Sequence, residues 1–307
     1  MEWDFSSYAL GATLYMPIVH HRVPAYLSGE ARFPASSVVL CLEDALADDD
    51  VARGIATLKN LLKNSRLCSE AKVFVRPRSL EMALELAQFA GIEQIDGFVA
   101  PKIVPETAAA WMDVAEGANV RIMPTVESSQ FYDPGRIIAL RDVFDAYDAR
   151  RIAAIRLGGN DLLAGMALRR HPGITSWEGP LAWVLAMASS ILISSGYPVA
   201  APVFDIIQDV ETLRREVTQD AAAGFISKTA IHPAQVAPIL EAFRVSQADL
   251  AQARAILDEN ASAVFQINGM MCEPSTHRAW AQRIQARSTF FGVTDARLKP
   301  DFDEVYG

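Results

Sequence analysis

Acidic and basic residues recur directly after short apolar runs of this sequence, where β-strands would end. In chain order they are Glu43, Asp44, Arg76, Lys102, Glu127, Asp161, Asp205, Lys228 and His232. Carboxylates can bind Mg²⁺ or transfer protons, and a guanidinium can bind a carboxylate through two hydrogen bonds. A single acid at a strand end is more often a helix cap or an ion-pair partner. Because acids and bases follow seven different runs, the pattern predicts one shared polar site.

Eight apolar runs separate these polar residues, and we interpret each run as a strand. They span residues 13–18, 37–43, 72–77, 96–101, 121–127, 152–157, 198–203 and 224–230. Most are apolar on both faces, which is typical of parallel strands covered by helices. Helical spacing occupies the intervening segments 48–65, 79–90, 104–117, 133–147 and 209–223. Eight alternations predict a (β/α)8 TIM barrel, with an open doubly wound sheet as the alternative.

A barrel of about 250 residues leaves part of the 307-residue chain for an extension. We therefore expect a barrel domain over residues 1–240 and a C-terminal helical extension and tail over residues 241–307. Helical spacing continues after Pro233 to about Asn260, and a second helix is predicted near Ser275–Arg287. The tail from Phe290 to Gly307 is interpreted as a lid or a partner-binding arm.

Composition narrows the classes of partner. A formal net charge of −9 and the lack of long Lys/Arg runs argue against a nucleic-acid partner, which would need a basic surface. Cys41, Cys68 and Cys272 show no metal-binding or disulfide spacing, so we expect free thiols and a cytoplasmic location. The N-terminal segment shows no targeting peptide. The charge-free stretch 179–204 is broken by serine, glycine and proline and predicts a buried helix, a turn and a strand instead of a membrane span.

The segment that follows the sixth predicted strand contains two further candidate groups. Gly158 and Gly159 lack a phosphate-binding pattern, and we interpret them as room for a ligand beside Asp161. Residues 163–180 are long for a connection in a barrel, so a mobile flap is predicted. Arg169 and Arg170 would contact an anionic part of the substrate, or would instead pair with acids at a subunit contact.

Seven short motifs occur in the order found in the citrate lyase β-subunit-like branch of the HpcH/HpaI aldolase superfamily, which the sequence resembles over about residues 12–240. The motifs are LEDAL (42–46), VRPRS (75–79), APK (100–102), PTVES (124–128), LGGNDLL (157–163), ALRR with EG (167–170, 178–179) and GFISKTAIHPAQV (224–236). The last motif is the most specific. A narrower similarity points to the lyase-like barrels associated with tellurium-resistance gene clusters.

The resemblance implies a Mg²⁺-dependent lyase or aldolase that acts on a carbon–carbon bond of a small oxo- or hydroxy-carboxylic acid or its thioester. It assigns Glu127 and Asp161 as Mg²⁺ ligands and Arg76 as the anchor of a substrate carboxylate or keto group. Glu43 is expected to hold Arg76 or a metal-bound water, and Asp44 is left open as a base or a positioning group. The expected partners are the carboxylic-acid substrate and further copies of this chain.

One departure from the family concerns coenzyme A. The first predicted strand and its surroundings read GATLYMPIVHHRVPAYL, with no Arg before the strand, Ile18 in place of a glycine, and no Lys before residue 59. We therefore expect coenzyme A to bind weakly or not at all.

Two other functions compete with the metal-dependent lyase. A metal-free aldolase would form a Schiff base through Lys102 or Lys228, which requires an amine kept partly neutral. A catalytically inactive barrel would bind a metabolite or a partner protein on the same fold.

Overall fold

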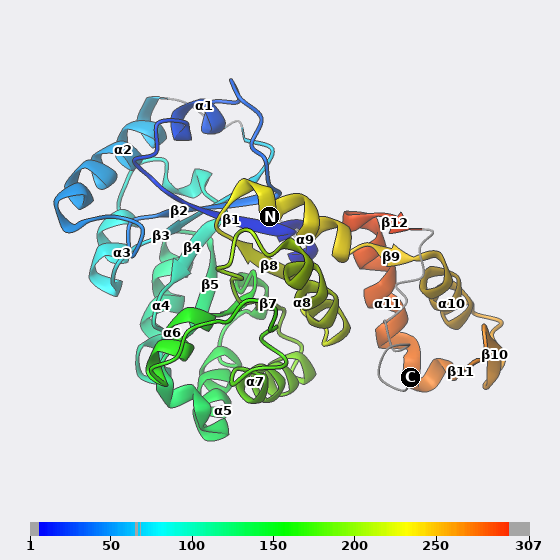
Figure 1. Cartoon of the computed structure of the whole chain (residues 1–307). Coiled ribbons are helices and arrows are strands. Elements are labelled where there is room, and N and C mark those ends of the chain that lie inside the picture. Colours follow the sequence, from blue (N-terminus) through cyan, green and yellow to red (C-terminus); the bar gives the residue numbers. More distant parts are fainter. Residues whose placement is uncertain (1–5, 65–66, 68, 295–307) are drawn as a thin grey trace. The chain divides into compact units, whose positions relative to one another are not determined.

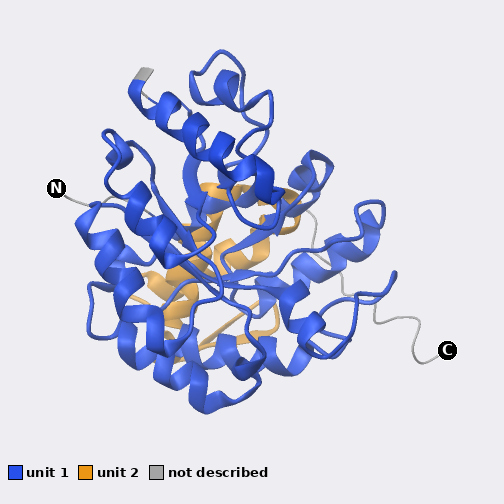
Figure 2. Cartoon of the chain, turned by 90° about the vertical axis from the view of Figure 1, so that its left-hand side faces the viewer, with its two compact units in different colours: residues 1–239 blue, residues 240–307 orange. Residues whose placement is uncertain are grey.

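A computed structural model describes residues 6–64, 67 and 69–294 of the chain (Figure 1). The chain divides into two compact units, Met1–Ile239 and Leu240–Gly307, which are coloured separately in Figure 2. Within the described ranges, no helix is sufficiently long and apolar to cross a membrane.

The first unit contains a closed barrel of eight parallel strands in sequence order. They are β1 (Ala12–Pro17), β2 (Ser37–Cys41), β3 (Lys72–Arg76), β4 (Gly97–Ala100), β5 (Arg121–Val126), β6 (Ile155–Leu157), β7 (Val199–Ala201) and β8 (Ser227–Ala230). Strand β1 pairs with both β2 and β8, and this pairing closes the sheet. The prediction of a (β/α)8 barrel is therefore confirmed.

Helices alternate with the strands and cover the outside of the barrel. They are α1 (Val23–Leu27), α2 (Val51–Asn64), α3 (Leu80–Leu86), α4 (Pro105–Gly117), α5 (Pro134–Phe144), α6 (Gly159–Gly165), α7 (Ala182–Ser194), α8 (Val210–Ala222) and α9 (Val236–Ala242). Side-chain caps begin several of them: Ser79 accepts a hydrogen bond from the Met82 amide, and Asp133 accepts one from the Gly135 amide. The charge-free stretch forms α7 and β7.

The strands are buried on both faces, so apolar residues alternate between two cores. Val38 packs in the large cluster between strands and helices, while its neighbour Val39 points into the barrel with Phe74 and Met123. Toward the C-terminal ends of the strands the interior becomes polar, with Arg76 and Arg156 among the inward-pointing residues. Active sites of TIM barrels lie at this end.

The second unit contains the predicted helices together with short strands that the sequence did not predict. It contains β9 (Val245–Ser246), α10 (Gln247–Leu257), β10 (Phe265–Ile267), β11 (Met270–Cys272), α11 (Pro274–Phe291) and β12 (Val293–Thr294). The helical region predicted from Pro233 to about Asn260 forms as α9 and α10, which are separated by β9, and β9 pairs with β12, a strand remote in sequence. The Ser246 hydroxyl then caps α10 through the Asp249 amide. The second predicted helix lies within α11.

The remaining sequence predictions concern the cysteines and the C-terminal tail. Cys68 and tail residues 295–307 lie outside the described residues. Cys41 and Cys272 are free, buried thiols.

Candidate active site

The C-terminal ends of β2 to β6 bring several of the predicted site residues together. Arg76 ends β3, Glu43 and Asp44 follow β2, and Glu127 directly follows β5. Lys102 follows β4 and connects two of these groups, because its ammonium lies 3.2 Å from Glu43 Oε1 and its backbone N–H donates to Glu127 Oε1 at 2.6 Å.

Arg76 is fixed by contacts in three directions. Nη1 lies 2.9 Å from Glu43 Oε2, Nη2 lies 3.3 Å from Asp44 Oδ2, and Nε donates to Cys41 Sγ at 3.3 Å. Its Cζ is also 5.3 Å from the centre of the Tyr15 ring. A guanidinium has five N–H donors, so these contacts leave donors for a ligand. The side chain is 12% exposed and is therefore oriented before a ligand arrives.

Glu127 and Asp161 form the candidate cation site. Glu127 is buried, and Asp161 lies in the first turn of α6. Burial, together with the negative charge of Asp161, raises the pKa of Glu127 to about 8, although the Lys102 amide and Arg76 oppose the increase. Two negative carboxylates that repel each other favour binding of a cation, because its positive charge offsets the repulsion.

The donor set fits Mg²⁺ better than zinc. In the part of the chain that the structure describes, no group of three or more His, Cys, Asp or Glu side chains is arranged to ligate a metal, as a zinc site requires. Mg²⁺ is commonly held by one or two carboxylates, with water and substrate oxygens completing its shell.

The Lys102 backbone contributes to this site through an unusual conformation. Its φ angle is +49°, in the left-handed region that non-glycine residues rarely adopt. In this conformation the Lys102 N–H reaches the buried Glu127 carboxylate. Retention of such a conformation next to candidate ligands is typical of functional sites.

Gly158 lies against the side chain of Glu127. A Cβ atom at Gly158 would lie 2.4 Å from Glu127 Cβ and 2.5 Å from Glu127 Oε2. A Cβ atom at Gly159 would lie 2.9 Å from Pro202 Cβ. The space into which a side chain would project is thus filled by protein at both glycines, and Gly158 makes room for the Glu127 carboxylate. Contact of the two glycines with a ligand stays a prediction.

Gly158→Ala is therefore expected to displace Glu127 and to weaken Mg²⁺ binding at least about tenfold, which corresponds to roughly 1.4 kcal/mol. Gly117→Ala is the matched control, because a Cβ atom at Gly117 would meet no atom within 4 Å. Calorimetric titration of both variants measures the effect. Equal Mg²⁺ affinities in the two variants would contradict this account of Gly158.

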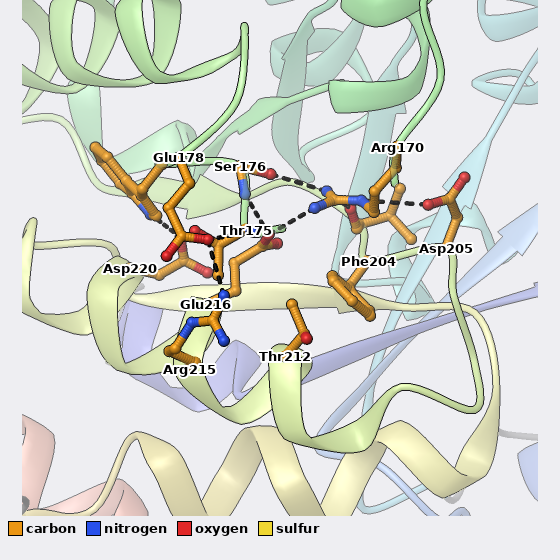
Figure 3. Close-up of polar contacts among 12 residues, drawn as sticks. Arg170, Thr175, Ser176, Glu178, Phe204, Asp205, Thr212, Arg215, Glu216 and Asp220 are labelled. Atoms are coloured by element: carbon orange, nitrogen blue, oxygen red, sulfur yellow. Dashed lines mark hydrogen bonds and ion pairs between the residues drawn. The ribbon is translucent and has the colours of Figure 1, made fainter. Parts of the chain in front are cut away.

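The assignment of Arg170 to the substrate is corrected by the structure. Arg170 lies in a buried network beside α8, where its Nη1 is 2.6 Å from Glu216 Oε2 and its Nε is 3.2 Å from Asp205 Oδ1 (Figure 3). Nη2 donates to Ser176 Oγ and to the Val203 carbonyl, both at 2.8 Å. With its side chain 4% exposed, Arg170 pairs with two acids of its own chain.

The same network holds the segment that was predicted to be a mobile flap. The Ser176 amide donates to Glu216 and the Trp177 indole donates to Asp220, so the segment is bound to α8 at several points. Arg169 is exposed on this segment, and its contact with a substrate stays a prediction.

Arg170→Met should lower the free energy of unfolding by about 3–5 kcal/mol, because it leaves Glu216 without one of its buried cations. The neighbouring variant Arg169→Met should change it by less than about 0.5 kcal/mol. Urea unfolding of the two variants makes the comparison. Similar stabilities would mean that the Arg170 network contributes little to the fold.

Neither candidate Schiff-base lysine fits that chemistry. A hydrogen bond and the negative charge of Glu43 raise the pKa of Lys102, which keeps its amine protonated. Lys228 is fully buried between β8 and α8, 2.8 Å from Glu216 Oε1 and 2.7 Å from Asp220 Oδ2. His232 caps the turn after β8 by accepting from the Ala234 amide.

Sequence reasoning missed Tyr15, Cys41 and Arg156, which surround or underlie Arg76. Arg156 could have been identified from the sequence, because it is a charged residue inside the apolar run IAAIRL. Tyr15 and Cys41 could not, since an aromatic residue and a cysteine are both ordinary in a buried strand.

A parallel eight-stranded barrel with acids and an arginine at its C-terminal mouth defines a TIM-barrel enzyme site. The chain belongs to the family of C–C bond lyases of the TIM-barrel fold, whose model matches residues 4–293. It is thus a carbon–carbon lyase of the citrate lyase β-subunit-like HpcH/HpaI superfamily, as the motifs predicted.

Characterised relatives agree with this membership. An L-malyl-CoA/β-methylmalyl-CoA lyase of Rhodobacter capsulatus is 28% identical over 265 residues, which cover 76% of this chain and 80% of the relative. A citrate lyase subunit β-like protein of Deinococcus radiodurans is 27% identical, with 78% and 84% covered.

Solved structures share the fold. The CitE protein of Mycobacterium tuberculosis, in complex with magnesium, acetoacetate and coenzyme A, has a TM-score of 0.67 at 22% identity, with 91% of this chain and 98% of that chain covered. A citrate lyase of Burkholderia xenovorans has a TM-score of 0.71 at 17% identity, with 94% of each chain covered. The expectation that coenzyme A is not used finds no support among these relatives.

Proposed function

We propose that this chain is a Mg²⁺-dependent lyase that cleaves or forms a carbon–carbon bond in a small oxo- or hydroxy-carboxylic acid or its coenzyme A thioester. The observation that carries the proposal is the buried Glu127 carboxylate beside Asp161, with Arg76 at the same mouth. The names of the relatives support the substrate class.

Glu127 and Asp161 would hold the cation, and Mg²⁺ bound there would act as a Lewis acid on a carbonyl or hydroxyl oxygen. The Lys102 N–H keeps Glu127 in place. Arg76 offers the substrate its remaining donors, which suit a carboxylate because the guanidinium is planar and oriented by Glu43 and Asp44.

Glu43 and Asp44, the two acids after β2, have different roles. Glu43 contacts Arg76 with one oxygen and Lys102 with the other, so it positions both cations. Burial raises the pKa of Glu43, Arg76 opposes this, and the neighbouring Asp44 adds to it. Asp44 has a side chain that is 58% exposed, so its carboxylate lies in contact with solvent.

We therefore assign proton transfer to Asp44. In the cleavage direction it accepts the proton of the substrate hydroxyl, the new carbonyl forms, and the electron pair of the broken carbon–carbon bond remains on the other fragment. Arg76 stabilises the negative charge of that fragment.

A panel of small hydroxy acids and their coenzyme A thioesters, each with Mg²⁺ or with EDTA, tests the proposal. We expect cleavage with Mg²⁺, loss of activity with EDTA, and no covalent trapping by borohydride. Activity that survives EDTA and is trapped by borohydride would identify the Schiff-base aldolase. Absence of turnover, together with tight binding of one compound, would identify a metabolite-binding barrel.

The proposal includes a homo-oligomer in the cytoplasm. Buried free thiols at Cys41 and Cys272 are consistent with a reducing compartment. Light scattering after gel filtration measures the assembly.

A further inference from the structure

Arg156 is a buried cation beneath the candidate site. It lies in the middle of β6, points into the barrel and is 2% exposed. Nη1 lies 3.4 Å from Thr13 Oγ1 and 3.5 Å from Met123 Sδ, and Nη2 donates to Thr229 Oγ1. All of these acceptors are neutral. Within residues 6–64, 67 and 69–294, no carboxylate forms an ion pair with Arg156, although buried charges are normally paired.

The Tyr15 ring lies close to both Arg156 and the site residue Arg76. Cζ of Arg156 lies 5.4 Å from the ring centre, and Cζ of Arg76 lies 5.3 Å from the same centre. Both distances are in the range of cation–π contacts. Arg76 is neutralised by Glu43 and Asp44, whereas Arg156 is not.

The charges around the mouth show what an additional cation would do. Glu127 must be ionised to hold a cation. With Glu127 ionised, four carboxylates face two cations there, so the mouth has a net charge of minus two, and a bound divalent cation would neutralise it. A neutral mouth exerts no net attraction on an anionic substrate. The residues counted in this net charge are Glu43, Asp44, Glu127, Asp161, Arg76 and Lys102.

We propose that Arg156 is a positioning residue that holds Tyr15 beneath Arg76 and makes the Mg²⁺-loaded mouth net positive, which favours a substrate carrying a carboxylate. Its charge acts through the protein interior, where screening by salt is weak. The inference rests on the proposed function, because it assumes a cation at Glu127 and Asp161.

This function has a signature that a packing function lacks. Removing the charge at Arg156 should strengthen binding of the divalent cation and weaken binding of the anion. Loss of packing alone would weaken both. Opposite changes in the two affinities therefore distinguish the electrostatic function from a structural one.

Arg156→Gln is the informative variant, because an amide can still hydrogen bond to the hydroxyls of Thr13 and Thr229. We expect Mg²⁺ affinity to increase about tenfold and acetoacetate affinity at saturating Mg²⁺ to decrease about tenfold. Arg156→Lys keeps the charge and should return both affinities to within about threefold of the original chain. Calorimetry measures both affinities, and thermal unfolding verifies the fold. Arg156→Met replaces the Gln variant if the latter does not fold.

The outcomes separate this inference from the proposed function. Failure of the original chain to bind Mg²⁺ would refute the cation site itself and with it the proposed function. If the original chain binds Mg²⁺ and Arg156→Gln binds it equally well, only the inference about Arg156 is overturned. Equal losses of acetoacetate affinity in the Gln and Lys variants, or no acetoacetate binding by the original chain, would also overturn it.

Discussion

Asp161→Asn and Glu127→Gln are each expected to abolish measurable Mg²⁺ binding and to lower kcat/KM by at least about a thousandfold. Either change removes one negative charge from the pair of residues that would hold the cation. The fold should remain, because Asp161 is partly exposed and the side-chain carbonyl introduced by Glu127→Gln can still accept the Lys102 N–H. Calorimetric Mg²⁺ titration and steady-state kinetics measure the two effects.

The matched control is Glu85→Gln, which removes an acid from the exposed face of α3. It should leave Mg²⁺ affinity and kcat/KM unchanged. If Asp161→Asn and Glu127→Gln both bind Mg²⁺ as tightly as this control, the pair is not the cation site.

Arg76→Lys should be almost as damaging to catalysis as Arg76→Ala, with kcat/KM lowered about a hundredfold to a thousandfold in both. Arg76 contacts Glu43, Asp44 and Cys41 in three directions and still has N–H donors for a ligand. An ammonium group cannot reproduce this planar arrangement, although it keeps the charge.

A Mg²⁺ titration of the same variants separates geometry from charge. Arg76→Lys should bind Mg²⁺ within about threefold of the original chain, because the local charge is retained. Near-normal kcat/KM in the Lys variant would mean that Arg76 contributes only its positive charge.

The sequence by itself determined the barrel and part of the site. Eight apolar runs, each followed by polar residues and a helical pattern, specify parallel strands whose ends meet at one mouth. For that reason Glu43, Arg76, Lys102 and Glu127 could be expected to lie together without knowledge of any contact.

Only the tertiary structure decided which side of a strand each charged residue faces. Lys228 and Thr229 are neighbours in β8, yet Lys228 points outward to α8 and Thr229 points inward to Arg156. Side chains alternate along a strand, so the barrel register decides whether a charge joins the site or the outer layer. Arg170 likewise joined the outer network because Glu216, 46 residues away in sequence, meets it there. Such long-range pairings depend on the packing of helices against strands, which no local pattern of residues encodes.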